Sequence, residues 1–433
     1  MRLLLLGDFS AKPASQKPPL SVRPSHRVDA DTLDEVMGRL RPQLKLAEAD
    51  ISFEQLDDFH PEQLYARLAQ FQELRQARSQ APSSGAAGLL DQLLGKSSGA
   101  RPGATSAAPA QAEATGIDNL IRNLVAPHIV PDQAASIQAQ HAAVDSVTTQ
   151  QMRGLLHEPA FQSLEAAWRG VQWLISNLEL DGPLELHIFD LSREELLADI
   201  VAAKGQLAQT GLHRALADRW RNLPGGQSWS ALVALYHFEA NDTDIGLLAA
   251  LGLLAAQAGG PLLAGAALSL ATLQAAEQAN WQALRNSEAA PWIGLAAPRV
   301  LLRLPYGKKN DPVEGFAFEE FDADPVHEEF LWGNGALAVA LLIGRAFNAR
   351  GWDFEPGVER DIIDLPAFTY LKDGEPELQA CAEQYLGEQA GLALLSAGLM
   401  PLLSHRHRNA VTVMRMQSIA MPARALAGLG RPR

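Results

Sequence analysis

The stretch LLHEPAFQSLEAAWRG at residues 155–170 lies within a long helical pattern and sets the character of this chain. The phrase PRVLLRLPYG at 298–307 encloses a predicted strand, and LWGNG at 331–335 directly precedes a predicted helix that extends to Arg350. Three phrases of this kind are not expected together by chance. Because helical and strand patterns alternate around them, they indicate an α/β fold with mixed sheets covered by helices.

The same alternation extends from these phrases toward both ends of the chain. Strands are predicted at residues 3–6, 44–53, 184–189, 229–238, 261–266, 300–304 and 411–416. Helices are predicted from residue 31, from 61 through 74, within 117–175, and at 194–203, 243–258 and 335–350.

Length, charge and cysteine usage restrict the class of protein. A chain of 433 residues is expected to form two or three domains. The formal net charge of −14 argues against nucleic acid as the main partner, since phosphate binding needs a basic face. The single cysteine, Cys381, excludes an internal disulfide framework and suits a reducing cytoplasm. The apolar start at 1–6 ends at Gly7-Asp8, too early for a secretory signal.

One uncharged run, residues 245–276, is long enough to span a bilayer. Gly259-Gly260-Pro261 interrupts it, and alanine and glycine dominate it rather than leucine. A buried helix at 243–258 followed by a buried strand at 261–266 is therefore expected, without membrane insertion.

The first part of the chain divides into two segments of different composition. Residues 1–80 carry a strand–helix–strand–helix pattern and predict a small N-terminal α/β domain. Residues 81–116 are rich in Ala, Ser, Gly and Pro and predict a flexible linker. Inside this linker lies a leucine-rich island, defined as Leu89, Leu90, Asp91, Leu93 and Leu94.

Motifs for catalysis or metal binding are weak or incomplete. Gly95-Lys96-Ser97 lacks the glycine and the preceding strand of a phosphate-binding loop. His405-Arg406-His407-Arg408 makes a poor metal site because the arginines repel a cation, and a surface turn is expected there. Cys381 lies in an acidic stretch predicted to be helical, and no helix end or basic group that would activate its thiol is apparent. No catalytic residue, metal ligand or cofactor is therefore predicted.

The end of the chain is basic although the protein as a whole is acidic. No acidic residue follows Glu388, whereas a candidate basic docking end is formed by Arg406, Arg408, Arg415 and Arg424. Such charge segregation favours docking on an acidic surface. A solvated tail is the alternative.

The three phrases, in this order and spacing, closely resemble the large subunit of the type VI secretion contractile sheath, the VipB or TssC family. The resemblance covers about residues 117–418, and further stretches that carry it are 285–288, 312–320, 347–352 and 399–402. It implies a contractile-sheath protomer body, a mechanical role and no enzymatic activity.

Residues 3–78 are similar to the small sheath subunit, the VipA or TssB family. LLLGDF at 4–9 and FEQLDDFHPE at 53–62 carry this resemblance. The chain thus looks like both subunits fused in one polypeptide: a small-subunit part at 1–80, the linker, a large-subunit part at 117–418 and a basic tail at 419–433. Fusion would hold the pair together by high effective concentration.

Two departures from the family shape the functional hypothesis. The small-subunit part begins almost at its first strand, and the large-subunit part ends soon after Ser418. The family uses both missing regions to share strands between neighbouring protomers. We therefore expect a terminal, capping or regulatory element that docks on sheath or baseplate. An exposed, partner-ready pair of strands elsewhere in the molecule would contradict this expectation.

Two alternatives remain open, an ordinary sheath subunit completed by partner strands and an α/β enzyme. The leucine-rich island resembles the element that the AAA+ disassembly ATPase ClpV grips as a helix, which would make that ATPase a partner. Packing of the island on its own domain is the other interpretation.

Overall fold

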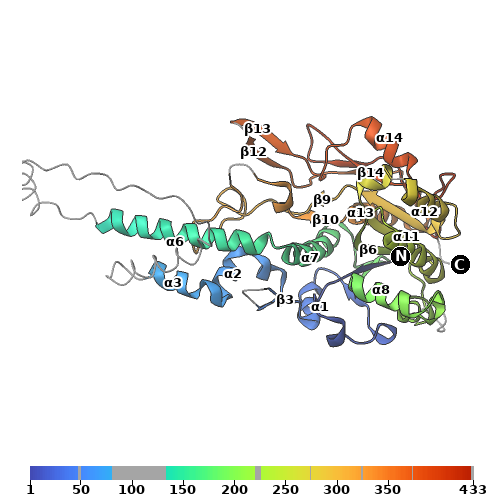
Figure 1. The fold of residues 1–433 in the computed structure, drawn as a ribbon, viewed down its shortest axis with the longest axis horizontal. Helices are drawn as coiled ribbons and strands as arrows, with labels where there is room; N and C mark the ends of the chain where they lie inside the picture. The colour runs from blue at the N-terminus through green and yellow to red at the C-terminus, as the bar shows by residue number, and fades with distance from the viewer. Residues whose placement is uncertain are drawn as a thin grey trace, which may run out of the picture.

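The computed structural model describes residues 1–46, 50–79, 133–219, 226–273, 275–322, 325–372 and 374–430. Its centre is a nine-stranded mixed sheet with the order β11-β15-β14-β8-β7-β6-β1-β5-β2 (Figure 1). The strands are β1 Arg2–Gly7, β2 His26–Val28, β5 Glu185–Asp190, β6 Ala231–Phe238, β7 Leu262–Ala266, β8 Ile293–Ala297, β11 Asp361–Ile362, β14 Met400–Ser404 and β15 Val411–Val413. The α/β class predicted from the sequence is confirmed.

The first strand of the chain lies inside this sheet. β1 pairs in parallel with β5 on one side, from Arg2 opposite Glu185 to Gly7 opposite Asp190. On its other side it pairs in parallel with β6, from Leu3 opposite Ala231 to Leu6 opposite Ala234. Leu3, Leu4, Leu5 and Leu6 are all fully buried, as expected for a strand covered on both faces. The N-terminal segment therefore contributes to the same core as the rest of the chain.

Helices cover both faces of the sheet because successive side chains of a strand point to opposite sides. Leu3 and Leu5 face the layer that contains α7 (Pro159–Asn177) and α13 (Gly335–Arg350). Leu4 and Leu6 face the layer that contains α8 (Arg193–Ala202), α11 (Asp242–Ala258) and α12 (Ala275–Arg285). No buried residue belongs to both of these hydrophobic layers, so the sheet separates two cores.

The winding of the sheet reverses at its first strand. In chain order the first five parallel strands are β1, β5, β6, β7 and β8, whereas their order in the sheet is β5-β1-β6-β7-β8. β5 is thus added on one side of β1 and the next three strands on the other. This is the doubly wound order 2-1-3-4-5, and it defines a topological switch point between β1 and β6.

A second group of elements extends away from the sheet. α6 (Gln133–Leu156) projects from the body, and α3 (Gln72–Ser79) lies alongside it (Figure 1). The remaining short elements of the N-terminal segment are α1 Leu33–Leu40, β3 Gln43–Lys45, β4 Asp50–Ser52 and α2 Pro61–Arg67.

Two predictions for the N-terminal segment need correction. The single strand predicted at 44–53 is an antiparallel pair, β3 and β4. The helix predicted from Pro61 through Leu74 breaks at Leu68, which has extended backbone angles. The Arg75 side chain donates to the carbonyl oxygens of Tyr65 and Leu68 there, so the broken helix end keeps hydrogen-bond partners.

The second half of the chain contains small additional sheets. The strand predicted at 300–304 is only β9 (Val300–Leu301), which pairs with β10 (Trp332–Gly333). An antiparallel pair, β12 (Phe368–Lys372) and β13 (Glu375–Gln379), stands out at the top of Figure 1, near its middle. Leu371 is 60% exposed on this hairpin. An exposed pair of strands therefore exists, which counts against the terminal role expected above and favours a subunit completed by partner strands.

The buried helix and strand expected within 245–276 are α11 and β7. Along the described part of the chain, no helix has both the length and the apolar character needed to cross a membrane. The helix α14 (Glu388–Ser396) and the helix α9 (Gly211–His213) complete the described α-helices.

The central position of β1 predicts that damage to it destabilises the whole body. Leu5→Ala should lower the free energy of unfolding by about 2–5 kcal/mol, because it leaves a cavity between buried neighbours. The matched control is Leu371→Ala at the exposed hairpin, with an expected change within about 0.5 kcal/mol. Urea unfolding followed by tryptophan fluorescence measures both. If Leu5→Ala left the main transition unchanged, residues 1–79 would be an appendage rather than part of this core.

Candidate functional site

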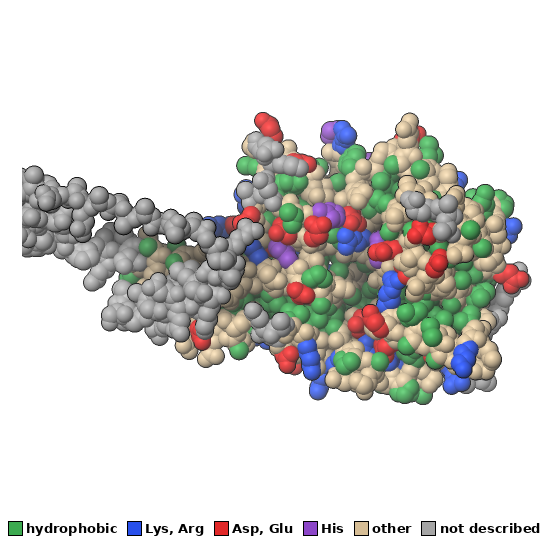
Figure 2. All heavy atoms as spheres, viewed as in Figure 1, with side chains coloured by type: hydrophobic (Ala, Val, Ile, Leu, Met, Phe, Trp, Pro, Cys, Tyr) green, Lys and Arg blue, Asp and Glu red, His purple; other side chains and the backbone are tan. Residues whose placement is uncertain are grey.

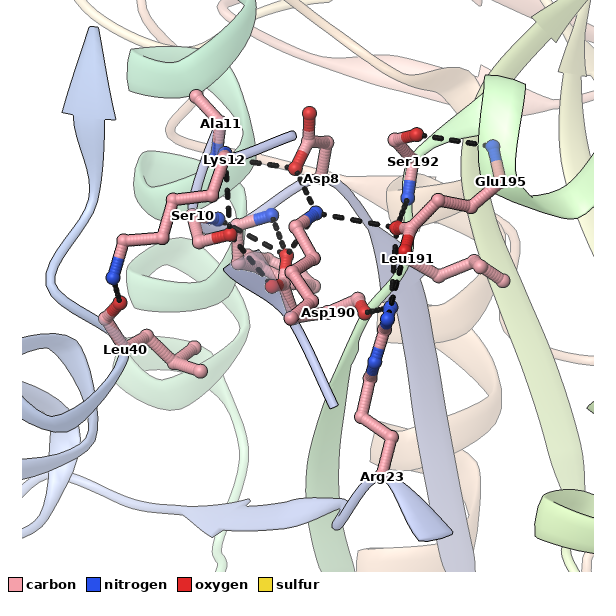
Figure 3. A network of polar contacts seen from close by, with 12 residues as sticks. Asp8, Ser10, Ala11, Lys12, Arg23, Leu40, Asp190, Leu191, Ser192 and Glu195 are labelled. Carbon is pink, nitrogen blue, oxygen red and sulfur yellow. Dashed lines mark hydrogen bonds and ion pairs between the residues drawn. The ribbon is translucent and has the colours of Figure 1, made fainter. Parts of the chain in front are cut away.

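The seam between the N-terminal segment and the remainder of the body centres on Asp190, at the end of β5 (Figure 3). One carboxylate oxygen of Asp190 accepts hydrogen bonds from the backbone N–H groups of Phe9 (2.9 Å) and Ser10 (3.0 Å). The other accepts from the Ser10 hydroxyl at 2.6 Å. Asp190 is 5% exposed, so these bonds are shielded from water. They fix the chain directly after β1 to the end of its neighbouring strand.

Two cations from the N-terminal segment extend this seam. Arg23 places Nη2 2.7 Å from Glu195 Oε1 and donates through Nη1 to the backbone oxygen of Asp190. Lys17 Nζ lies 2.8 Å from Asp8 Oδ1 and 3.3 Å from Glu195 Oε2. Burial alone would raise the pKa of Glu195, but the hydrogen bond from Arg23 and the charge of Lys17 lower it overall. Glu195 therefore remains ionised and paired.

Glu195 also orients the helix that follows β5. Ser192 caps α8 by accepting from the Glu195 N–H, and Glu195 accepts in return from the Ser192 N–H. This reciprocal capping box aligns the first turn of α8 with the seam. The same carboxylate thus binds Arg23 and sets the direction of a helix on the sheet.

Other contacts join the two segments away from Asp190. Trp168 on α7 donates its indole N–H to the Phe9 carbonyl at 2.9 Å. Arg78 on α3 pairs with Asp145 on α6 at 2.7 Å. Because these contacts are spread along the N-terminal segment, the seam is an extended interface.

A second buried network joins the sequence phrases that identify the fold. Glu165 on α7 is fully buried and pairs with Arg169 at 2.6 Å and with Arg303 at 2.8 Å. Arg303 also contacts Glu320 at 2.7 Å. Tyr306 receives a hydrogen bond from Arg169 at 2.6 Å. Two phrases therefore converge on one ion cluster with Glu320.

The charges in this ion cluster compensate one another. Burial by itself would raise the pKa of Glu320, but Arg303 outweighs it and lowers the pKa to about 2. Burial would likewise raise the pKa of Glu165, and Arg303 and Arg169 lower it overall. Both carboxylates are held as anions, which suits a structural cluster and leaves neither as a proton donor at neutral pH.

Glycines in the phrases allow close packing of this region. A Cβ on Gly170 would lie 2.6 Å from Leu337, where α7 meets α13. A Cβ on Gly335 would lie 2.8 Å from the backbone oxygen of Pro298. Asn334 caps α13 by accepting from the Ala336 N–H. The small residues of the phrases therefore permit the backbone to approach its neighbours.

The predicted site residues fall into two groups. The leucine-rich island and Gly95-Lys96-Ser97 lie outside the described residues. All four arginines of the basic docking end are exposed. Arg406 and Arg408 lie on the arginine loop, residues 405–409, which connects β14 to β15. Arg415 and Arg424 follow β15.

The environment of Cys381 differs from the prediction in one respect. It lies in a non-helical stretch beside an isolated β-bridge of Ala382 with Val300, so the expected helix is absent there. Burial raises the pKa of its thiol to about 11, consistent with an unreactive cysteine. Within the described ranges, no group of three or more His, Cys, Asp or Glu side chains is arranged to hold a metal ion.

A cavity of about 630 Å³, which was not predicted from the sequence, lies at the carboxyl ends of β1, β5 and β6. Asp8, Ser192 and His237 line it from these strand ends, and Trp332 and Asn334 line it from the segment that precedes α13. Acidic, basic and histidine side chains gather at the middle of the face shown in Figure 2. A signal was present, because Asp8 lies two residues after the predicted strand 3–6 and Ser192 three residues after the predicted strand 184–189.

Comparisons with known proteins agree with this architecture. A family described as VipB, EvpB/VC_A0108, tail sheath N-terminal domain, matches residues 138–420. A second family, described as Type VI secretion system, VipA, VC_A0107 or Hcp2, matches residues 1–83. The chain is 32% identical over 313 residues to the type VI secretion system sheath protein TssC1 of Pseudomonas aeruginosa. That match covers 67% of this chain and 63% of the relative, so the chain spans less than two thirds of the relative's length.

The lowered pKa of Glu320 predicts a defined acid response. Its pKa decreases from 4.5 to about 2 in the folded state, so the cluster stabilises the fold above pH 4.5 and loses this contribution as the pH falls toward 2. Glu320→Gln should lower the free energy of unfolding by about 3–5 kcal/mol at neutral pH, because Arg303 loses a buried charged partner. It should also make the free energy of unfolding depend less on pH between pH 4.5 and 2. Urea unfolding at several pH values measures this. Exposed Glu319→Gln is the control, and equal slopes for both variants would contradict the assignment.

Proposed function

This chain belongs to the VipB family of type VI secretion tail sheath proteins and carries a VipA-like segment ahead of it, and we propose that it works as a fused sheath protomer that docks on sheath or baseplate as a terminal, capping or regulatory element. In this proposal the small-subunit part is residues 1–80, the linker 81–116, the large-subunit part 117–418 and the basic tail 419–433. The family is structural, so the function is to occupy a place in an assembly.

The position of β1 is the observation that carries this proposal. A strand from the VipA-like segment lies between two strands of the VipB-like segment, with hydrogen-bonded pairing on both sides. One polypeptide thus supplies both the central strand and the sheet around it. Such a body needs no second chain to complete its core.

The edges of the main sheet support a terminal role. Within the described residues the outer strands are β2, with three residues, and β11, with two. Arg27 lies on the first edge and Asp361 on the second. Short, charged edges disfavour pairing with the edge of another sheet. Docking through side-chain surfaces is therefore favoured over growth by sheet extension.

The basic docking end offers such a surface. Arg415 and Arg424 have no acidic partner within the described part of the chain, and Arg408 lies 4.0 Å from Asp361 with both side chains more than half exposed. Arg406 stacks over the Tyr385 ring at 5.0 Å. Exposed guanidinium groups with few carboxylate partners favour contact with an acidic sheath or baseplate surface.

The β12–β13 hairpin favours a second candidate, an ordinary sheath subunit that is completed by strands of a partner. Pro376 and Leu378 are exposed on it, and Leu371 lies opposite Pro376. A projecting hairpin with exposed backbone edges can accept an added strand. This candidate differs from the first in whether the chain enters a growing tube.

For the leucine-rich island we retain the role of a ligand for the AAA+ disassembly ATPase ClpV. Four leucines and Asp91 within six residues match a short amphipathic helix that could enter a groove. The unpaired Cys381 suits a protein that works in a reducing cytoplasm, where this ATPase would act.

The terminal role predicts that the purified chain forms no long tubes but binds full-length sheath subunits. Reversing the charge of the four arginines to glutamate should weaken that binding about tenfold or more and reduce its salt dependence. Negative-stain microscopy and a binding titration at two salt concentrations measure these effects, with Arg39→Glu on exposed α1 as control. Long tubes from the chain alone would exclude capping, and mixed tubes on co-expression would identify an ordinary subunit.

The ATPase interpretation predicts a selective loss. Deleting residues 86–96 should remove the AAA+ ATPase from a pull-down in cells that carry the whole secretion cluster, because the helix that enters its groove is gone. Sheath subunits should remain bound, since the deletion leaves the basic docking end intact. Replacing the same residues with an equally long Gly/Ser stretch controls for linker length. Unchanged ATPase capture would leave the island as a helix packed on its own chain.

A further inference from the structure

The cavity at the switch point is a feature that the sheath role does not use. It lies where the winding of the sheet reverses between β1 and β6, at the carboxyl ends of the parallel strands. Ligands of open α/β sheets bind at this position, because the connections diverge there and leave a crevice. Its volume of about 630 Å³ is within the range of binding sites.

The acidic groups that line the cavity are incompletely neutralised. Glu194 and Glu328 are exposed and have no ion pair within the described ranges. Asp8 accepts hydrogen bonds from Lys17 Nζ and from the Ala11 N–H, and both are made to the same oxygen, Oδ1. In Figure 3 the second carboxylate oxygen of Asp8 has no dashed contact to any residue drawn. Burial raises the pKa of Asp8, as expected for a carboxylate that lacks sufficient positive charge nearby.

The basic groups that line the cavity are already paired with carboxylates outside it. Arg299 holds Glu383 through two contacts, at 2.6 and 2.8 Å. Arg193 pairs with Asp244 on α11. Burial and the nearby Arg299 lower the pKa of His237, so this histidine is neutral at pH 7 and adds no positive charge. The electrostatic potential in the cavity, once these pairs are formed, therefore favours a cation.

One wall of the cavity is aromatic. Phe330 and Trp332 are 3% and 7% exposed, and both line it. Tyr236 also lines the cavity. A guanidinium group binds well where aromatic faces lie beside carboxylates, since it stacks on the ring and donates in its own plane.

The arginine loop lies at the same edge of the sheet. β14 runs parallel to β8, so the loop after Ser404 emerges at the carboxyl edge, as the cavity does. Strands β7 and β8 separate β14 from β6. With strands about 4.8 Å apart, the loop and the cavity are offset by roughly 15 Å along the edge. Two copies that face each other across this edge, related by a two-fold axis, would place each loop opposite the other copy's cavity.

We propose that the cavity receives Arg406 and Arg408 of a second copy of this chain, in a closed two-fold pair held by two identical contacts. Each contact joins guanidinium groups of the arginine loop to Asp8, Glu194 and Glu328, against the wall of Phe330 and Trp332. The pair covers the cavity edge of both copies, which goes beyond the proposed sheath role and does not require the sheath. A closed pair ends at two copies, because both faces that could recruit a third are occupied.

Charge reversal tests the contact. The cavity variant is Glu194→Lys with Glu328→Lys, and the loop variant is Arg406→Glu with Arg408→Glu. Sedimentation velocity should show a dimer of the unaltered chain at about 50 mM salt that weakens at about 500 mM. Each variant alone should associate at least tenfold more weakly, because like charges then face each other. An equimolar mixture of the two variants should form a one-to-one dimer, since both contacts become attractive again.

Controls separate this contact from general charge effects. Glu54→Lys with Glu73→Lys changes the same number of exposed acids away from the cavity and should leave the dimer unchanged. Arg406→Gln with Arg408→Gln removes the cations without adding acids and should also weaken it. Circular dichroism verifies that each variant is folded. A monomeric unaltered chain at low salt, association beyond two copies, or a mixture that stays monomeric would each overturn the proposal, whatever the result for sheath binding.

Discussion

The double pairing of β1 is the constraint on which the rest of the molecule depends. A strand with neighbours on both sides and helices on both faces satisfies its backbone groups only when those neighbours are present. Its partners β5 and β6 come from beyond residue 184, so the body cannot form until distant parts of the chain meet. The seam around Asp190 then fixes the direction in which the chain leaves β1, because its carboxylate binds the next two backbone N–H groups.

The buried ion cluster around Arg303 gives a physical meaning to the sequence phrases. Removing several charges from water is costly, and a hydrophobic replacement is often as stable. A cluster with complete pairing instead requires its members to meet in one arrangement. Here Glu165, Arg303 and Glu320 come from three separate stretches and satisfy one another. We interpret the cluster as selecting the relative position of α7 and the 298–320 region.

Sequence patterns predicted the elements that have strong local signals. The capped helices α8 and α11 and the alternating or leucine-rich strands β1, β5 and β6 were all anticipated. β8 was missed because its sequence, IGLAA, is short, covered on both faces and without alternation. The helix after Pro61 was predicted to be too long because its apolar spacing continues through Leu68. Only the contacts of Arg75 with the backbone show that the helix ends there. The cavity needs residues from 8 to 337 together, so no local pattern could define it.

The parallel ladders on both sides of β1 also have a mechanical consequence. A force that pulls β1 along its own axis must break the hydrogen bonds to β5 and to β6 at the same time, because all three strands run in one direction. A force applied to the two-residue edge strand β11 meets far fewer bonds and can peel it away. Tension on this sheet would therefore rupture its rim before its middle.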